Sequence, residues 1–152
     1  VSMQYRHAII SDIHGNLEAL NAVLEDIEQH AVTRILCLGD VVGYGPNPAE
    51  CLRAAQGFNV TLLGNHELAL TQGPDRFNAA ARRAIEWTRS ELQKTAEGRE
   101  LFLAASKLPT THIFDGILYV HGSPSAPTTE YLMPNIARHP ERILPQFRHF
   151  DR

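Results

Sequence analysis

Polar residues that could bind divalent cations or transfer protons follow short apolar runs in this sequence. They are Asp12, His14, Asp40, Asn65, His66 and His121. Carboxylate, imidazole and amide oxygen groups together suit Mn²⁺, Fe²⁺ or Zn²⁺. The cysteines Cys37 and Cys51 lack the spacing of metal ligands, and Cys37 lies within an apolar run typical of a core. The pattern predicts a metal centre without sulfur ligands.

Short apolar runs at residues 7–10, 35–38 and 60–63 are predicted to be buried parallel strands that carry these polar residues at their carboxyl ends. Helical periodicity predicts an amphipathic helix over residues 16–30. Asn47-Pro48-Ala49-Glu50 predicts an N-cap, a first-turn proline and a capping-box glutamate for a helix that ends at Gln56. This alternation is typical of a mostly parallel sheet, where ligands bind at the carboxyl ends of the strands.

The second half of the chain is expected to add helices and a hairpin. Asn78 is predicted to cap a helix that extends to about Thr95, and a shorter helix is expected at residues 100–105. Asp115-Gly116 lies between two apolar runs and predicts an antiparallel hairpin that ends before His121. The stretch to Arg138 is expected to be loop, and residues 140–147 could form a last helix that Pro145 limits.

Each of these polar residues also has an ordinary structural explanation. Asp12 could cap the following helix, Asp40 could be a turn residue, and Asn65 could occupy a left-handed turn. His14 could be a surface histidine, and His121 could be a half-buried one without a ligand. Their common position at predicted strand ends favours a functional explanation, because the structural one needs several coincidences.

The ordered set of motifs resembles the calcineurin-like metallophosphoesterase superfamily, and its small prokaryotic phosphodiesterase-like members in particular. The motifs are Asp12-Ile13-His14, Gly39-Asp40, Gly64-Asn65-His66-Glu67 and Val120-His121-Gly122. The resemblance extends from His7 to about Phe147. It implies an α/β sandwich in which a mostly parallel sheet is flanked by helices.

The resemblance further implies two divalent metal ions, which would be Mn, Fe or Zn. Asp12 and His14 would hold one ion, Asn65 and His121 would hold the other, and Asp40 would bridge them. Two cations about 3.5–4 Å apart would activate a water molecule and neutralise charge on the phosphoryl group.

His66 is the residue that this assignment leaves for acid–base catalysis. The protein-phosphatase branch has two phosphate-binding arginines and a carboxylate that orients this histidine, whereas Gly43-Tyr44-Gly45 and Leu63 stand at those positions here. A phosphoserine dianion would be held poorly without the arginines. The sequence therefore favours phosphodiesters, phosphate esters or nucleotides over phosphoproteins, and Tyr44 could either touch the substrate or serve in packing.

The family's final Gly-His-x-His motif, which gives each metal one more ligand, does not occur before Arg152. His139 and His149 lack its glycine and spacing and are interpreted as surface residues. We therefore expect residues 1–152 to form a single, truncated metallophosphoesterase domain with an incomplete second sheet. Its metals would be held loosely and its activity would be weak.

The same interpretation predicts association. An apolar face formed by Ile113, Ile117 and Tyr119 would be left exposed, and such faces rarely persist on a soluble monomer. We expect the chain to form a homo-oligomer or to associate with the missing C-terminal segment.

Composition excludes several other classes of protein. The chain has 152 residues, and its 14 Lys and Arg against 17 Asp and Glu give a net charge of −3. Without a basic surplus, stable nucleic-acid binding is not expected. No apolar stretch approaches the roughly 20 residues that cross a bilayer. The few cysteines favour a cytoplasmic protein.

Two function classes remain. The first is a metal-dependent phosphoric ester hydrolase that acts on a small phosphorylated substrate through a water activated by two metals. The alternative is a catalytically impaired regulatory module that binds metal and phosphate. A phosphate loop made of Gly39, Gly43 and Gly45 does not fit, because no Gly-x-Gly-x-x-Gly follows a strand and opens a helix. An aspartyl-phosphate phosphatase is disfavoured, because the first strand does not end in paired aspartates.

Overall fold

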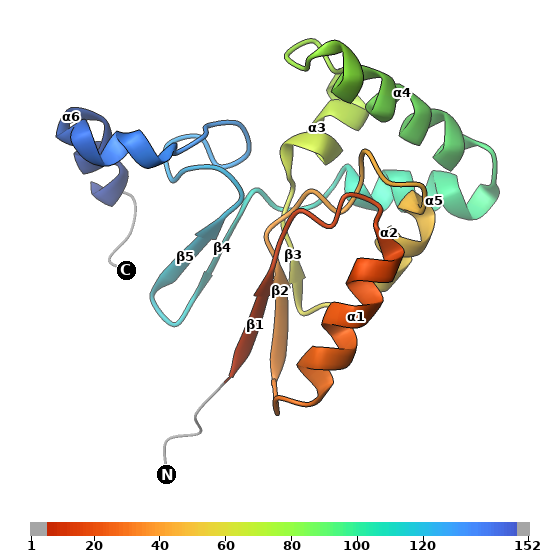
Figure 1. Cartoon of the computed structure of the whole chain (residues 1–152), viewed down its shortest axis with the longest axis horizontal. Helices are drawn as coiled ribbons and strands as arrows, with labels where there is room; N and C mark the ends of the chain where they lie inside the picture. The colour runs from red at the N-terminus through yellow and green to blue at the C-terminus, as the bar shows by residue number, and fades with distance from the viewer. Residues whose placement is uncertain (1–5, 149–152) are drawn as a thin grey trace.

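A three-stranded parallel sheet forms the centre of the molecule, as seen in a computed structural model that describes residues 6–148 (Figure 1). Strands β1 (His7–Ile10), β2 (Arg34–Cys37) and β3 (Val60–Thr61) lie side by side in chain order. Ile9 pairs with Leu36 in the first ladder, and Cys37 pairs with Thr61 in the second. All three carboxyl ends therefore lie at one end of the sheet, which confirms the prediction. β3 is shorter than the predicted run 60–63.

Helices cover one face of this sheet. They are α1 (Leu17–Glu28), α2 (Pro48–Ala55) and α5 (Ala96–Ala105) (Figure 1). Their buried apolar side chains pack with Cys37, which is fully buried as predicted. α1 begins where the sequence predicted, because the Asn16 carboxamide oxygen accepts a hydrogen bond from the Ala19 N–H at 3.0 Å.

The predicted capping box at the start of α2 is wrong. Asn47 occupies the cap position and Pro48 the first turn, but the Asn47 side chain makes no capping hydrogen bond. The residue is held through its backbone, because its N–H donates to the Gly15 carbonyl at 3.1 Å and its carbonyl accepts from the Cys51 N–H at 3.1 Å. The start of α2 is thus fixed by the loop that follows β1.

Two helices lie beyond the carboxyl ends of the strands. α3 (Asn65–Gln72) starts directly after β3, and α4 (Ala79–Gln93) packs against both α3 and α5 (Figure 1). Asn78 caps α4 as predicted, through hydrogen bonds of 3.0 Å from the N–H groups of Ala80 and Ala81. The predicted apolar side of α4 is buried at Ala81, Ile85, Thr88 and Leu92.

The other face of the sheet packs against an antiparallel hairpin of β4 (Thr111–Phe114) and β5 (Ile117–Val120). Tyr119 is buried against Leu36 of β2 and against Leu62, which directly follows β3. The prediction that Ile113 shares a face with Ile117 and Tyr119 is wrong. Ile113 pairs with Leu118, and successive residues of a strand point to opposite faces, so Ile113 lies on the outer face and is 68% exposed.

The chain continues as short helical turns: a 3₁₀-helix at Pro134–Arg138, α6 at Pro140–Ile143 and a second 3₁₀-helix at Leu144–Arg148. The single helix predicted for residues 140–147 is therefore divided, because Pro145 has no N–H to continue the α-helical ladder. His139 is exposed as predicted and lies 3.1 Å from Glu141, and His149 lies outside the described residues. Within residues 6–148, none of the helices combines the length and the apolar character that a bilayer span requires.

Candidate metal centre

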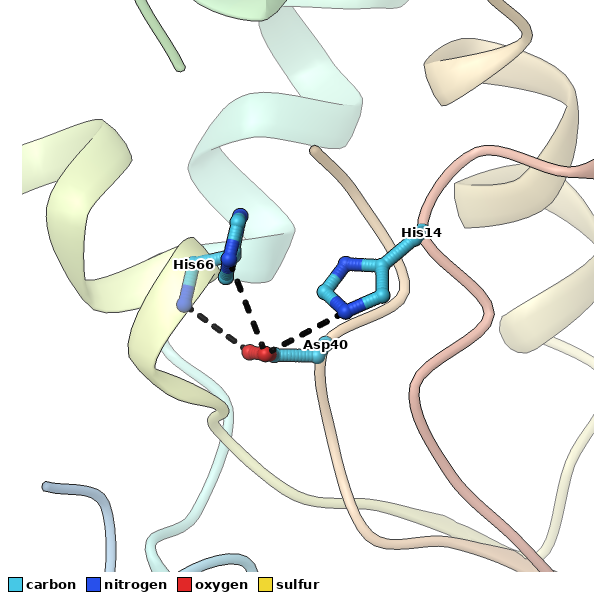
Figure 2. A group of neighbouring side chains, drawn as sticks. All are labelled: His14, Asp40 and His66. Atoms are coloured by element: carbon cyan, nitrogen blue, oxygen red, sulfur yellow. Dashed lines mark hydrogen bonds and ion pairs between the residues drawn. The ribbon is translucent and has the colours of Figure 1, made fainter. Parts of the chain in front are cut away.

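The carboxylate of Asp40 lies at the middle of the candidate site. Asp40 follows β2 and is only 2% exposed. Its Oδ2 atom lies 3.8 Å from Nε2 of His14, 4.0 Å from Nε2 of His66 and 3.6 Å from Nε2 of His121. Figure 2 shows the carboxylate between His14 and His66. Residues from three strand ends and the hairpin thus meet at one point, as the sequence predicted.

Backbone carbonyl groups fix the orientation of two of the imidazole rings. Nδ1 of His14 lies 3.1 Å from the Val42 carbonyl oxygen, and Nδ1 of His121 lies 3.1 Å from the Leu38 carbonyl oxygen. When Nδ1 donates to a carbonyl, Nε2 carries the lone pair, which is the arrangement usual for histidines that bind metals. Both rings therefore direct Nε2 at the Asp40 carboxylate.

The contacts of His121 fit a bound cation. Its Nδ1 faces the Leu38 carbonyl, while its Nε2 lies 2.9 Å from Oδ1 of Asn65. A neutral imidazole has one N–H and cannot donate to both acceptors. A divalent cation shared by Nε2 and Oδ1 would satisfy both, and neighbouring octahedral ligands bonded at about 2.1 Å are separated by about 3 Å.

Two groups of candidate ligand atoms share Asp40. One contains His14, Asp40 and His66, the other contains Asp12, Asp40 and His121, and the atoms of each group lie within 4.8 Å of one another. The groups differ from the partition that the resemblance implies, which places Asp12 with His14. The division of the ligands between two ions, and the assignment of His66 to catalysis, stay predictions.

His66 is held in a closed, largely aromatic environment at the start of α3. Its ring centroid lies 4.6 Å from that of His14, 4.8 Å from that of Tyr44 and 5.0 Å from that of Phe77. Burial, followed by the nearby His14 and His121, lowers the pKa of His66 to about 4. The imidazole is therefore neutral at pH 7. Its Nδ1 atom is buried and has no hydrogen-bond partner among the described residues.

Gly43 stands beside His66 at the position where the protein-phosphatase branch has a carboxylate. A Cβ atom added to Gly43 would lie 2.1 Å from Nδ1 of His66, and Gly43 has a φ of +94°. Both observations require glycine at this position. Gly43 therefore allows the loop after β2 to approach the imidazole ring closely.

Glu67 ties the two sides of the site together, a role that sequence reasoning missed. Its side chain is fully buried and accepts hydrogen bonds from three backbone N–H groups: those of Asp40 at 2.9 Å, Val42 at 3.0 Å and Gly64 at 3.0 Å. Burial, the largest influence, raises the pKa of Glu67 to about 7, while the three donors oppose this change. Capping of α3 accounts only for the Gly64 contact.

A second set of contacts holds Asp40 itself. The backbone N–H of His66 donates to Oδ1 of Asp40 at 2.8 Å. Burial raises the pKa of Asp40 to about 7, the His66 N–H opposes this, and the nearby Asp12 raises it further. A bound cation would stabilise the ionised form of this carboxylate.

The backbone of the site is strained. Asp12, His14, Asp40 and Tyr44 have φ values of 56°, 50°, 54° and 61°. These values lie in the left-handed region, which residues other than glycine rarely adopt. Among the described residues, only Ala31 and Asp115 share this property outside the site. Such strain concentrates where side chains must be aimed at a ligand.

Comparison with known proteins identifies the family. The sequence matches the family described as calcineurin-like phosphoesterase over residues 5–148. The chain belongs to this family. A crystal structure of a metallophosphoesterase from Sphaerobacter thermophilus is 39% identical, covers 94% of this chain and superposes with a TM-score of 0.74. The α/β architecture described above is therefore that of a metallophosphoesterase.

Two curated relatives of this calcineurin-like phosphoesterase extend the comparison. An uncharacterized protein of Methanocaldococcus jannaschii is 40% identical over 135 residues, which are 84% of this chain. A symmetrical bis(5′-nucleosyl)-tetraphosphatase of Pseudomonas fluorescens is 37% identical over 65 residues, which are 40% of this chain. The chain spans 54% of the archaeal protein, 22% of the tetraphosphatase and 56% of the Sphaerobacter chain.

Proposed function

We propose that this chain is the metal-binding part of a phosphoester hydrolase whose substrates are phosphodiesters, phosphate esters or nucleotides. The observation that carries the proposal is that three imidazole rings converge on one buried carboxylate, that of Asp40. Membership of the calcineurin-like phosphoesterase family supports it. The proposed metal ligands are Asp12, His14, Asp40, Asn65 and His121.

The roles of the residues follow from their positions. Asp40 touches both candidate ligand groups and would be shared between two ions. The chemistry that bound divalent cations supply is to lower the pKa of water and to neutralise charge on phosphoryl oxygens. His66 is neutral and its Nδ1 has no acceptor within the part of the chain that the structure describes, so we assign its proton to Nε2, on the side of Asp40. From there its N–H would donate a hydrogen bond to the leaving oxygen and stabilise the charge that develops on it.

The surroundings of the site favour singly charged phosphodiesters. The open groove beside the centre is lined by Asp12, His14, Tyr44 and Pro46, and the described residues place no arginine along it. A dianionic phosphate monoester would lack the bidentate partner that holds such groups tightly. The likeness to a symmetrical bis(5′-nucleosyl)-tetraphosphatase adds nucleotides to the substrates worth testing.

Hydrolysis of bis-p-nitrophenyl phosphate, measured together with metal content, tests the proposal. We expect turnover that EDTA abolishes and Mn²⁺ restores. Asp40→Asn should lower both metal content and rate, whereas His66→Gln should keep the metal and lower kcat by about 10²-fold. The exposed Glu86→Gln serves as a matched control.

The outcomes separate the two function classes. Turnover that survives complete metal removal would refute the metal-dependent mechanism. Metal binding that depends on Asp40 without any turnover would favour the regulatory module instead. Full metal content in Asp40→Asn would refute the ligand assignment.

A further inference from the structure

A cavity of about 420 Å³ opens next to Asn65, beside the metal centre. One wall comes from α3 and the loop that leads to α4, and the other comes from the segment that follows β5. Its size lies within the range of about 300–1,000 Å³ that is usual for small-molecule sites. Because Asn65 lines this cavity and also contacts His121, the cavity lies directly beside the candidate metal ligands.

The cavity offers flat surfaces. Phe77 lines it, and the same ring makes a T-shaped contact with that of His66. Tyr131 lines it from the segment after β5, is 68% exposed, and its phenol interacts with the side chain of Asn65. Exposed aromatic rings that flank a reactive centre provide stacking surfaces for planar ligands.

The cavity also carries polar groups that the fold does not use. The side chains of Arg76, Asp75 and Gln72 line it, and none of them makes a hydrogen bond or ion pair with any residue that the structure describes. Arg76 can stack on a ring or bind an anion, while Asp75 and Gln72 offer hydrogen-bond acceptors and donors. All three residues are exposed to solvent, so their polar groups are accessible to a ligand with a polar edge.

We propose that this cavity binds the nucleobase of a nucleotide substrate, with Tyr131 and Arg76 as the residues that determine specificity. The inference rests on the proposed function in one respect, since it assumes that the phosphate of the same ligand reaches the metal centre. The base lies against Tyr131 and Arg76, and its polar edge meets Asp75 and Gln72. A sugar phosphate without a base leaves the cavity unfilled.

Calorimetric titration of the chain with adenosine 5′-monophosphate and with ribose 5-phosphate tests the proposal. Both ligands carry the same phosphate, so the ratio of their affinities reports the contribution of the base. We expect adenosine 5′-monophosphate to bind at least 5-fold more tightly, the lower limit of a base-stacking contact. The ratio is measured in metal-free and in Mn²⁺-loaded protein, so it does not depend on turnover.

Variants assign the effect to the cavity. Tyr131→Ala and Arg76→Ala should each bring the ratio toward 1, and both residues are exposed, so the fold is retained. Arg83→Ala, an exposed arginine of α4 outside the cavity, should leave the ratio within 2-fold of the parent. Tyr44→Ala tests the groove on the other side of the centre.

A parental ratio near 1 would overturn the proposal, as would a ratio that Tyr131→Ala and Arg76→Ala both leave unchanged. An affinity ratio that falls to about 1 only in Tyr44→Ala would place the base in the groove beside Tyr44 and would also overturn the proposal. If hydrolysis is never found but the ratio depends on Tyr131 and Arg76, the proposed function fails and the base site stands.

Discussion

Replacing Glu67 with glutamine should destabilise the protein by about 2 kcal/mol. One carboxylate oxygen accepts from the N–H groups of Asp40 and Gly64, and the other accepts from that of Val42. The amide oxygen of glutamine can replace the first oxygen, but its NH₂ group must then face the Val42 N–H. This loses one hydrogen bond to a charged group, worth about 1.5–3 kcal/mol. The lower cost of burying a neutral amide offsets part of the loss.

Urea unfolding followed by circular dichroism measures this effect. With a slope of about 1–3 kcal/mol per molar urea, a loss of about 2 kcal/mol lowers the midpoint by about 1 M. The control Glu86→Gln carries the same chemical change on an exposed face of α4 and should stay within about 0.5 kcal/mol of the parent. Glu67→Ala, which leaves three buried N–H groups unpaired, should be too unstable to purify as a folded protein.

The experiment is performed at pH 8, above the value of about 7 to which burial raises the pKa of Glu67. A midpoint for Glu67→Gln within 0.2 M of the parent would refute the reasoning. It would mean that the loop after β2 keeps its backbone N–H groups satisfied without a carboxylate.

Three further predictions concern stability and reactivity. Burial raises the pKa of Cys37 to about 12 and that of Cys51 to about 11. Neither thiol should therefore react with Ellman's reagent at pH 8 until urea unfolds the chain. A thiol of the native protein that reacts within minutes would contradict this prediction. Asn16→Ala should cost about 1 kcal/mol of unfolding free energy and Asn47→Ala clearly less, since only the first side chain caps its helix; equal losses would show that capping is not the cause. Gly43→Ala should destabilise by about 2 kcal/mol or more, because its Cβ meets a buried imidazole at positive φ, and unchanged thermal unfolding would refute that packing.

Much of the fold could be predicted because the signals were local. Apolar runs, the cap at Asn78 and the turn at Asp115-Gly116 each act within a few residues, and all three predicted the right element. The face of Ile113 was misassigned because the two-residue turn fixes the register, and this register pairs Ile113 with Leu118. Here a shift of one residue along the strand is a change of face.

The candidate site could be predicted as a set of residues but not as a network. Strand ends converge in any parallel sheet, so the meeting of Asp40 with the histidines followed from their positions. The role of Glu67 did not, because two of its three donors lie 25 and 27 residues away in sequence. Tyr131 carried no signal either, since it comes from a segment without helical or strand periodicity. Contacts of this kind depend on how loops meet, which a single sequence does not encode locally.

The left-handed backbone at Asp12, His14, Asp40 and Tyr44 has an evolutionary consequence. Each such residue costs roughly 1 kcal/mol relative to glycine at the same position, a large sum for a domain whose net stability is about 5–15 kcal/mol. Glycine would relieve the backbone strain at all four positions and would remove a proposed ligand at three of them. Selection for activity therefore opposes selection for stability here. A lineage that no longer needs catalysis should drift to glycine or asparagine at these positions first, and that pattern would distinguish inactive homologues from active ones.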